Sequence, residues 1–172
     1  MRMKRTISGF TIVELLIVIV VIGVLAAISI VAYNGITERA RFTAMRSDLS
    51  QLNKLIQAYY AQNGSYPITP GVCNGVSGNW CGWDQASGDA FIPGIVPTFA
   101  ASLPQLPATN ASNDTYLYRS PSGTDYKLIR LVGAGLSASE QSAFADLSTT
   151  TCSAGINTTR WGYWSSSVSQ CW

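Results

Sequence analysis

The sequence predicts an α+β protein, in which a long N-terminal transmembrane and then amphipathic α-helix packs against a small antiparallel β-sheet head. Three observations predict this class. An apolar run begins near the N-terminus, and apolar residues continue after it at the spacing of one helix face. Farther along, two segments of strand composition are separated by a turn signal. With 172 residues and no repeat or linker, we expect the remainder to form one domain of ordinary size.

A short basic leader precedes the apolar run. Residues 1–9 contain Arg2, Lys4 and Arg5 and end at Gly9. Lysine and arginine are enriched on the side of a membrane span that stays in the cytoplasm. We therefore expect a cytoplasmic N-terminus, with the residues after the span outside.

The apolar run at residues 13–32 has the length of a membrane span. About 20 helical residues at roughly 1.5 Å each cover a hydrocarbon core of about 30 Å. Two simpler interpretations stay open: a signal anchor, or a secretory signal peptide cut near Ala27-Ile28-Ser29. The run is longer than the roughly 7–15 apolar residues usual in a signal peptide. Neither interpretation explains Glu14, because a carboxylate at the edge of a span is costly and needs a partner.

The helix is predicted to continue beyond the membrane. One face carries apolar side chains spaced three and four apart, which is typical of a helix that packs on a core; these residues are Phe42, Met45, Leu49, Leu52, Ile56 and Tyr59. Asn63-Gly64 favours a left-handed helix end, and Pro67 prevents continuation. We expect the half from about Met45 to pack under the sheet and the earlier half to stay bare.

The sheet is predicted from two segments. Thr115–Ser120 and Asp125–Gly133 have strand composition, and the intervening Pro121-Ser122-Gly123-Thr124 indicates a turn, so an antiparallel hairpin follows. Residues 68–114 are crowded with Gly, Pro, Asn and Ser, which indicates an irregular loop between helix and sheet.

The C-terminal region adds smaller elements. Ser137-Ala138-Ser139-Glu140 has the form of a capping box that opens a short helix ending near Leu147. We expect residues 157–172 to supply a further strand or two.

All four cysteines lie in the C-terminal hundred residues. Their even number in a small, loop-rich domain outside the membrane favours disulfides over a metal site or free thiols. Three pairings are possible, and we favour Cys73–Cys81 and Cys152–Cys171 because each closes a local loop. A metal site is disfavoured, since the chain has no histidine and no Cys-x-x-Cys pair.

Charge and composition disfavour two classes of function. Without the three leader cations, 8 basic residues face 9 acids, so charge does not indicate a nucleic-acid surface, although weak or local binding stays open. Asp84 with Asp89, and Asp114 with Asp125, are conceivable carboxylate pairs, but loop acids are more often solvated. Without histidine no nucleophile–base set can be built, and no calcium loop is present. We expect no enzymatic activity and no cofactor.

Aromatic residues gather in the two cysteine-bearing regions; they are Trp80, Trp83, Trp161, Tyr163, Trp164 and Trp172. Exposed rings at Trp161, Tyr163 and Trp164 could bind sugars, surfaces or single-stranded bases by stacking. The alternative, which we favour, is that these rings form the core of a head that has few aliphatic residues.

Residues 4–16 resemble the signal of type IV prepilins and pseudopilins, since the leader, Gly9, Phe10 and Glu14 fall at matching spacings. The resemblance is best across residues 4–67. It implies that a membrane-embedded prepilin peptidase cuts between Gly9 and Phe10 and N-methylates Phe10, and that Glu14 and Thr11 act in assembly. Many members of the family have proline where this chain has Val31, so its stem is expected to stay more continuously helical.

The implied cut gives Glu14 a partner. It creates an α-ammonium at Phe10, which can neutralise the carboxylate within one subunit or between neighbours. Such a pair in a low dielectric gives registry and specificity even where its net stabilisation is modest.

The resemblance implies a structural subunit of a type IV pilus-like filament that polymerises through its hydrophobic helix. The implied partners are other pilin subunits, the prepilin peptidase, an inner-membrane assembly platform and, before assembly, the bacterial inner membrane through residues 13–32. The resemblance also implies that the assembled filament is extracellular. Three alternatives stay open: a pseudopilin of a type II secretion or DNA-uptake system, a minor tip pilin acting as an adhesin, and a signal-anchored binding protein that never assembles.

The expected domain organisation has four parts. Residues 1–9 form the leader, 10–33 the transmembrane and filament-core half of the helix, 34–63 its amphipathic half, and 64–172 the globular head.

Overall fold

The computed structural model describes residues 10–70, 72–73, 76–77, 82–106, 114–150 and 156–166. The chain divides into two compact units, Met1–Arg41 and Phe42–Trp172. Helix α1 and an antiparallel sheet are the main elements, which confirms the predicted α+β class.

Helix α1 spans Ile12–Asn63, 52 residues, so one helix runs from the apolar run to the predicted end at Asn63-Gly64. Neighbouring residues end the helix: Gly64 has a φ of +71°, and the Gly64 N–H donates to the carbonyl of Tyr60 at 2.8 Å. Glycine adopts this left-handed conformation without the strain that a Cβ would add. The predicted stop at Asn63-Gly64 is therefore confirmed.

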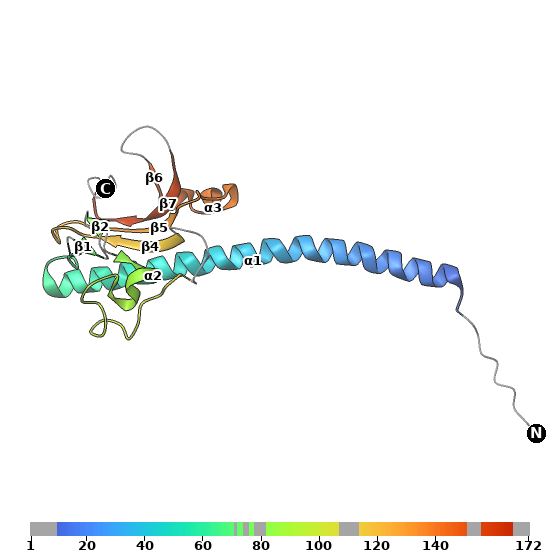
Figure 1. Cartoon of the computed structure of the whole chain (residues 1–172), viewed down its shortest axis with the longest axis horizontal. Coiled ribbons are helices and arrows are strands. Elements are labelled where there is room, and N and C mark those ends of the chain that lie inside the picture. Colours follow the sequence, from blue (N-terminus) through green and yellow to red (C-terminus); the bar gives the residue numbers. More distant parts are fainter. Residues whose placement is uncertain are drawn as a thin grey trace, which may run out of the picture. The chain divides into compact units, whose positions relative to one another are not determined.

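The amphipathic part of α1 forms one wall of the core, and the sheet lies along it (Figure 1). Met45, Leu49, Leu52 and Ile56 are at most 3% exposed. Phe42 and Tyr59, at the two ends of the predicted stripe, are partly buried against the same cluster. The predicted packing face is confirmed.

The main sheet has five strands in the order β3-β4-β5-β7-β6, and every neighbouring pair is antiparallel. Their bounds are β3 Gly82–Trp83, β4 Asp114–Arg119, β5 Lys127–Val132, β6 Ser148–Thr150 and β7 Ile156–Trp164. The predicted hairpin is β4–β5, with Tyr116 opposite Arg130. Its turn contains Gly123 at φ +76°. The further strand expected after residue 157 is β7.

The segment predicted to be an irregular loop contains more structure than expected. Strands β1 (Val72–Cys73) and β2 (Val76–Ser77) pair with each other, and β3 joins the edge of the main sheet. Helix α2 (Asp84–Ser87) and the 3-10 helix η1 (Gly88–Ala90) follow. Two-residue strands have no periodicity in the sequence, so they leave no pattern for a prediction to use.

The expectation that the loop acids are solvated is wrong for Asp84 and Asp114. Asp84 is fully buried, and its carboxylate accepts from the N–H groups of Leu106 at 2.6 Å and Tyr116 at 3.1 Å, and from the Thr115 hydroxyl. Asp114 is buried beside Arg130. A buried carboxylate that satisfies backbone N–H groups holds two segments together, so Asp84 fixes the 84–106 segment to β4.

Helix α3 (Ala138–Ala143) begins as predicted, and the 3-10 helix η2 (Ala145–Leu147) follows it. The Ser137 hydroxyl caps α3 by accepting from the Glu140 N–H at 3.2 Å. The second half of the predicted capping box is wrong, because the Glu140 carboxylate turns inward. It accepts from the indole N–H of Trp161 at 3.0 Å and is itself buried.

The face of the sheet that carries Lys127 is also covered, since Leu117, Lys127 and Ile129 are at most 2% exposed. Burial, together with the positive charges of Arg160 and Arg119, lowers the pKa of Lys127 to about 7. The unfolded lysine keeps its ordinary pKa of 10.5. The unfolded chain therefore binds more protons than the folded chain between these two pH values.

We predict that the free energy of unfolding rises with pH from about 7 to about 10.5 because of Lys127. Lys127→Met should remove this rise and should be the more stable protein below pH 7. Urea unfolding of the full chain in detergent, across the window, measures both effects. Lys54→Met, which changes an exposed lysine of α1, should keep the rise. Parallel curves for wild type and Lys127→Met would contradict the prediction.

Candidate functional site: the N-terminal junction and its apolar helix

Thr11 and Glu14 hold the beginning of α1 in a reciprocal arrangement. The Glu14 Oε2 atom accepts from the Thr11 N–H at 2.8 Å and from the Thr11 hydroxyl at 2.7 Å. In return, the Thr11 Oγ1 atom accepts from the Glu14 N–H at 3.2 Å. This is a capping box, in which two otherwise unsatisfied donors of the first helical turn find partners. Sequence reasoning missed it, although the Thr-x-x-Glu spacing ahead of an apolar run was available as a signal.

The geometry places the Glu14 carboxylate at the junction where the predicted cut lies. It contacts the backbone nitrogen of Thr11, and the nitrogen of Phe10 is one peptide unit away. Phe10 itself is 79% exposed. An α-ammonium formed at Phe10 would thus lie close to a carboxylate that can pair with it, the Glu14 carboxylate of its own chain or of a neighbouring chain.

The helix that follows carries an apolar surface that nothing in its own unit covers. Its large apolar side chains between residues 12 and 30 are 47–85% exposed. Among the described residues, α1 is the one helix long and apolar enough to cross a membrane. Surfaces of this kind require lipid or protein neighbours, because water around so large an apolar area is unfavourable.

The polar side chain within the apolar run is satisfied by the helix itself. The Ser29 hydroxyl donates to the carbonyl of Leu25 at 2.7 Å. A hydroxyl that bonds its own helix four residues back leaves no donor to be solvated. Ser29 is therefore compatible with a lipid or protein environment around this stretch.

Several predicted site residues lie outside the described residues. Gly9, on one side of the predicted cut, is among them, and so are Cys81, Cys152 and Cys171. The backbone of Cys73 lies in β1. The proposed cut and both disulfides therefore stay predictions.

The structure corrects the surface role considered for Trp161. The Trp161 ring is fully buried and stacks on Phe144, with ring centres 3.6 Å apart and planes 6° from parallel. The favoured alternative, a ring in the core, is correct for this residue. Tyr163 and Trp164 are half-buried, so a surface role for them stays a prediction. Trp80 and Trp172 lie outside the described residues.

The described residues offer no metal centre: nowhere among them do three His, Cys, Asp or Glu side chains gather. The candidate site comprises one acid, one hydroxyl and a long apolar helix.

Comparison with known proteins points to the same region. Residues 4–30 match the family described as "Prokaryotic N-terminal methylation motif". The chain is 30% identical over 66 residues to "Type II secretion system core protein G" of Pseudomonas aeruginosa, a match covering 38% of this chain and 46% of that protein. It is 36% identical over 60 residues to "Type IV major pilin protein PilE1" of Neisseria gonorrhoeae, covering 35% and 36%.

A third relative is "Fimbrial protein EcpC" of Eikenella corrodens, 31% identical over 81 residues, or 45% of this chain and 53% of that protein. The chain thus spans about half or less of the length of these relatives. No solved structure matches the chain.

Proposed function

We propose that this chain, which carries the prokaryotic N-terminal methylation motif and is similar to type IV pilins and type II secretion pseudopilins, is a structural subunit of a type IV pilus-like filament. The observation that carries the proposal is the exposed apolar helix that follows Glu14 within the methylation motif. Its role is structural and needs no catalytic residue or cofactor.

In this proposal residues 13–32 anchor the chain in the bacterial inner membrane before assembly, with its N-terminus in the cytoplasm and residues 64–172 outside. A prepilin peptidase cuts between Gly9 and Phe10 and methylates Phe10, and an inner-membrane platform adds subunits to the filament. Residues 10–33 then exchange lipid for neighbouring helices. Such head-to-tail contacts do not close into a ring, so they generate a fibre.

A second candidate is a pseudopilin of a type II secretion system. It is favoured by the similarity to core protein G of Pseudomonas aeruginosa and of Aeromonas hydrophila, the latter 36% identical over 66 residues. Both candidates share the same processing and assembly of the stem. Imaging of cells with and without the gene separates them: long surface fibres support a pilin, and secretion without such fibres supports a pseudopilin.

Mass spectrometry of the N-terminus of the native protein tests the proposal. We expect the mature chain to begin with N-methylated Phe10. A Gly9→Val variant should keep its leader, because a branched side chain replaces the residue that lets the backbone be approached most closely. A native protein that still begins at Met1 would instead be a signal-anchored monomer, and the proposal would fail.

A further inference from the structure

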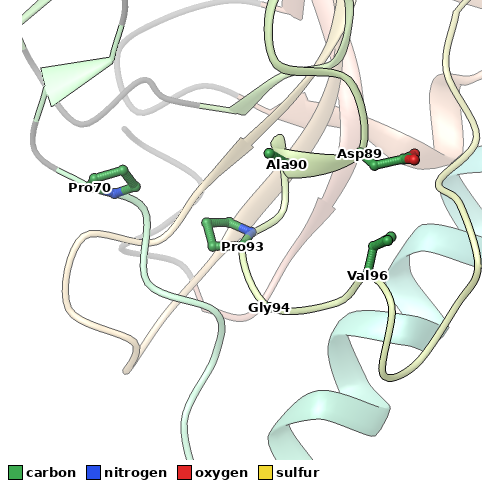
Figure 2. Close-up of a pocket in the computed structure, with 6 residues that line it drawn as sticks. All are labelled: Pro70, Asp89, Ala90, Pro93, Gly94 and Val96. Carbon is green, nitrogen blue, oxygen red and sulfur yellow. The ribbon is translucent and has the colours of Figure 1, made fainter.

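The head carries an open hollow with largely apolar walls (Figure 2). It has a volume of about 510 Å³ and is lined by residues that include Pro70, Pro93 and Val96. Asp89 also lines it, but Figure 2 shows its carboxylate directed away from both prolines, and that carboxylate accepts from the Leu103 N–H at 2.8 Å. A small-molecule site needs several polar groups that converge on the ligand, and the residues described around this hollow do not offer them. At the start of α1, by contrast, three polar contacts converge on two residues.

Thr11 defines where α1 starts. The helix begins at Ile12, and the Leu15 N–H donates to the Thr11 carbonyl at 3.3 Å. Thr11 therefore occupies the N-cap position, where the backbone is not helical although the carbonyl already accepts from the helix. The Thr11 hydroxyl accepts from the Glu14 N–H at 3.2 Å, and the Glu14 carboxylate accepts from the Thr11 N–H at 2.8 Å. The capping box thus fixes the first helical residue.

The cap leaves the residue before it outside the helix. Phe10 is not part of α1 and is 79% exposed. The proposed cut lies immediately before Phe10, so the scissile bond is close to the helix but not within it. Proteolysis concentrates in exposed chain outside regular structure, since the backbone groups of a helix are already engaged with one another. The position of the helix start therefore bears directly on cleavage.

The sequence offers a second place where the helix could begin. Ser8 lies three residues before Thr11, and serine caps helices at least as well as threonine. A helix that began after Ser8 would include both residues of the proposed cut, Gly9 and Phe10. A capping box needs Glu or Gln three residues after the cap; Thr11 has Glu14 there, whereas Ser8 has Thr11. The box therefore favours the later start.

We infer that Thr11 is a positioning residue for the prepilin peptidase, because its cap keeps the bond between Gly9 and Phe10 outside α1. This step rests on the proposed function, which supplies the cut. Thr11 acts through the conformation of the backbone and does not contact the reacting atoms. Without the cap, the helix extends toward Ser8 in a fraction of the molecules, and only the remaining fraction is ready to be cut.

Substitutions at Thr11 test this role in cells that express the full chain. Serine and asparagine also cap helices, whereas valine has the shape of threonine without its hydroxyl. We expect Thr11→Ser and Thr11→Asn to be cut at the wild-type rate. Thr11→Val and Thr11→Ala should be cut at least about threefold more slowly, within the limit of about thirtyfold that corresponds to a cap worth about 2 kcal/mol. Pulse-chase labelling and electrophoresis measure the rates, and membrane fractionation checks insertion.

Thr37→Val is the matched control. It removes from the same helix a hydroxyl that donates to the carbonyl of Tyr33 at 2.9 Å, far from the helix start. This variant should be cut at the wild-type rate. Backbone NMR shifts of the full chain in detergent micelles give a second readout, which does not depend on the peptidase. Phe10 should show helical shifts in Thr11→Val, but not in wild type or Thr11→Ser.

Two outcomes would overturn the inference while the proposed function stands. One is equal cleavage of wild type and Thr11→Val. The other is a rate that follows side-chain shape, with Thr11→Val cut normally and Thr11→Asn slowly, because the peptidase would then recognise the threonine itself. A wild-type chain that is never cut would instead defeat the proposed function, together with the cut that Thr11 is inferred to position.

Discussion

Replacing Glu14 with alanine should leave the chain in the membrane and abolish filament formation. The substitution removes the one acid at the start of the apolar run, so insertion of residues 13–32 becomes easier and not harder. It also removes the anion that the proposed α-ammonium of Phe10 would meet. Without that pair, a subunit entering the bundle would bury an uncompensated cation, which is strongly unfavourable in a low dielectric.

The capping box at Thr11 and Glu14 makes a sharper experiment possible. Glu14→Gln keeps an oxygen that can accept from the Thr11 N–H and hydroxyl, the two donors that Glu14 satisfies in the structure, but it removes the charge. If charge pairing drives assembly, Glu14→Gln should fail as completely as Glu14→Ala. If helix capping is what matters, Glu14→Gln should assemble and Glu14→Ala should not.

Counting fibres on cells that express each variant as the sole subunit decides between these outcomes, with membrane fractionation as the check on insertion. Glu38→Gln is the matched control, because Glu38 lies on the same helix beyond the apolar run. Normal fibres from Glu14→Ala would remove the electrostatic argument for assembly.

Local signals explain why the extent of α1 and the β4–β5 hairpin could be predicted from the sequence. A helix end at Gly64 and a turn at Gly123 each depend on a backbone conformation that glycine adopts easily. The apolar stripe from Met45 to Ile56 repeats every three or four residues, so its burial follows from helix geometry alone. These features need only neighbours in the sequence, and the structure agrees with them.

Buried polar groups with distant partners could not be predicted. In the sequence nothing distinguishes Asp84 from a solvated loop acid. Its partners, the N–H groups of Leu106 and Tyr116, are distant in the sequence and come close only in the folded chain. Glu140 lies at the capping-box position, and only the approach of β7 offers it the indole of Trp161 instead. In the candidate site, the Thr11–Glu14 contact lies within one helical turn, so the sequence alone could have predicted it. The proposed partner of Glu14 in a filament could not be predicted in this way, because it forms only after cleavage or comes from a neighbouring chain.

Arg130 of β5 connects four other elements, β4, α3, α1 and β7, through a buried network that was not apparent in the sequence. Its guanidinium, 1% exposed, forms an ion pair with Asp114 of β4, and its Nε atom lies 3.8 Å from Glu140 of α3. The same Nε donates to the sulfur of Met45 on α1 at 3.3 Å. Through Glu140 the network reaches Trp161 of β7. One cation thus compensates two buried carboxylates.

Arg130→Met should therefore destabilise the head by about 3–5 kcal/mol, because it leaves Asp114 and Glu140 buried without their cation. Arg46→Ala is the matched control: Arg46 pairs with Asp146, but both side chains are about half exposed. Loss of an exposed pair typically costs about 0–1 kcal/mol. Urea unfolding of the full chain in detergent measures both changes.

A third variant separates loss of the cation from loss of packing. Arg130→Met combined with Asp114→Asn and Glu140→Gln removes all three charges and keeps an acceptor for the Trp161 N–H. Replacing a whole buried ionic group with neutral residues of similar size is often nearly neutral, so the triple variant should regain most of the lost stability. If it stays as unstable as Arg130→Met alone, the arginine acts through its packing against Met45, and charge compensation is not what holds the sheet to the helix.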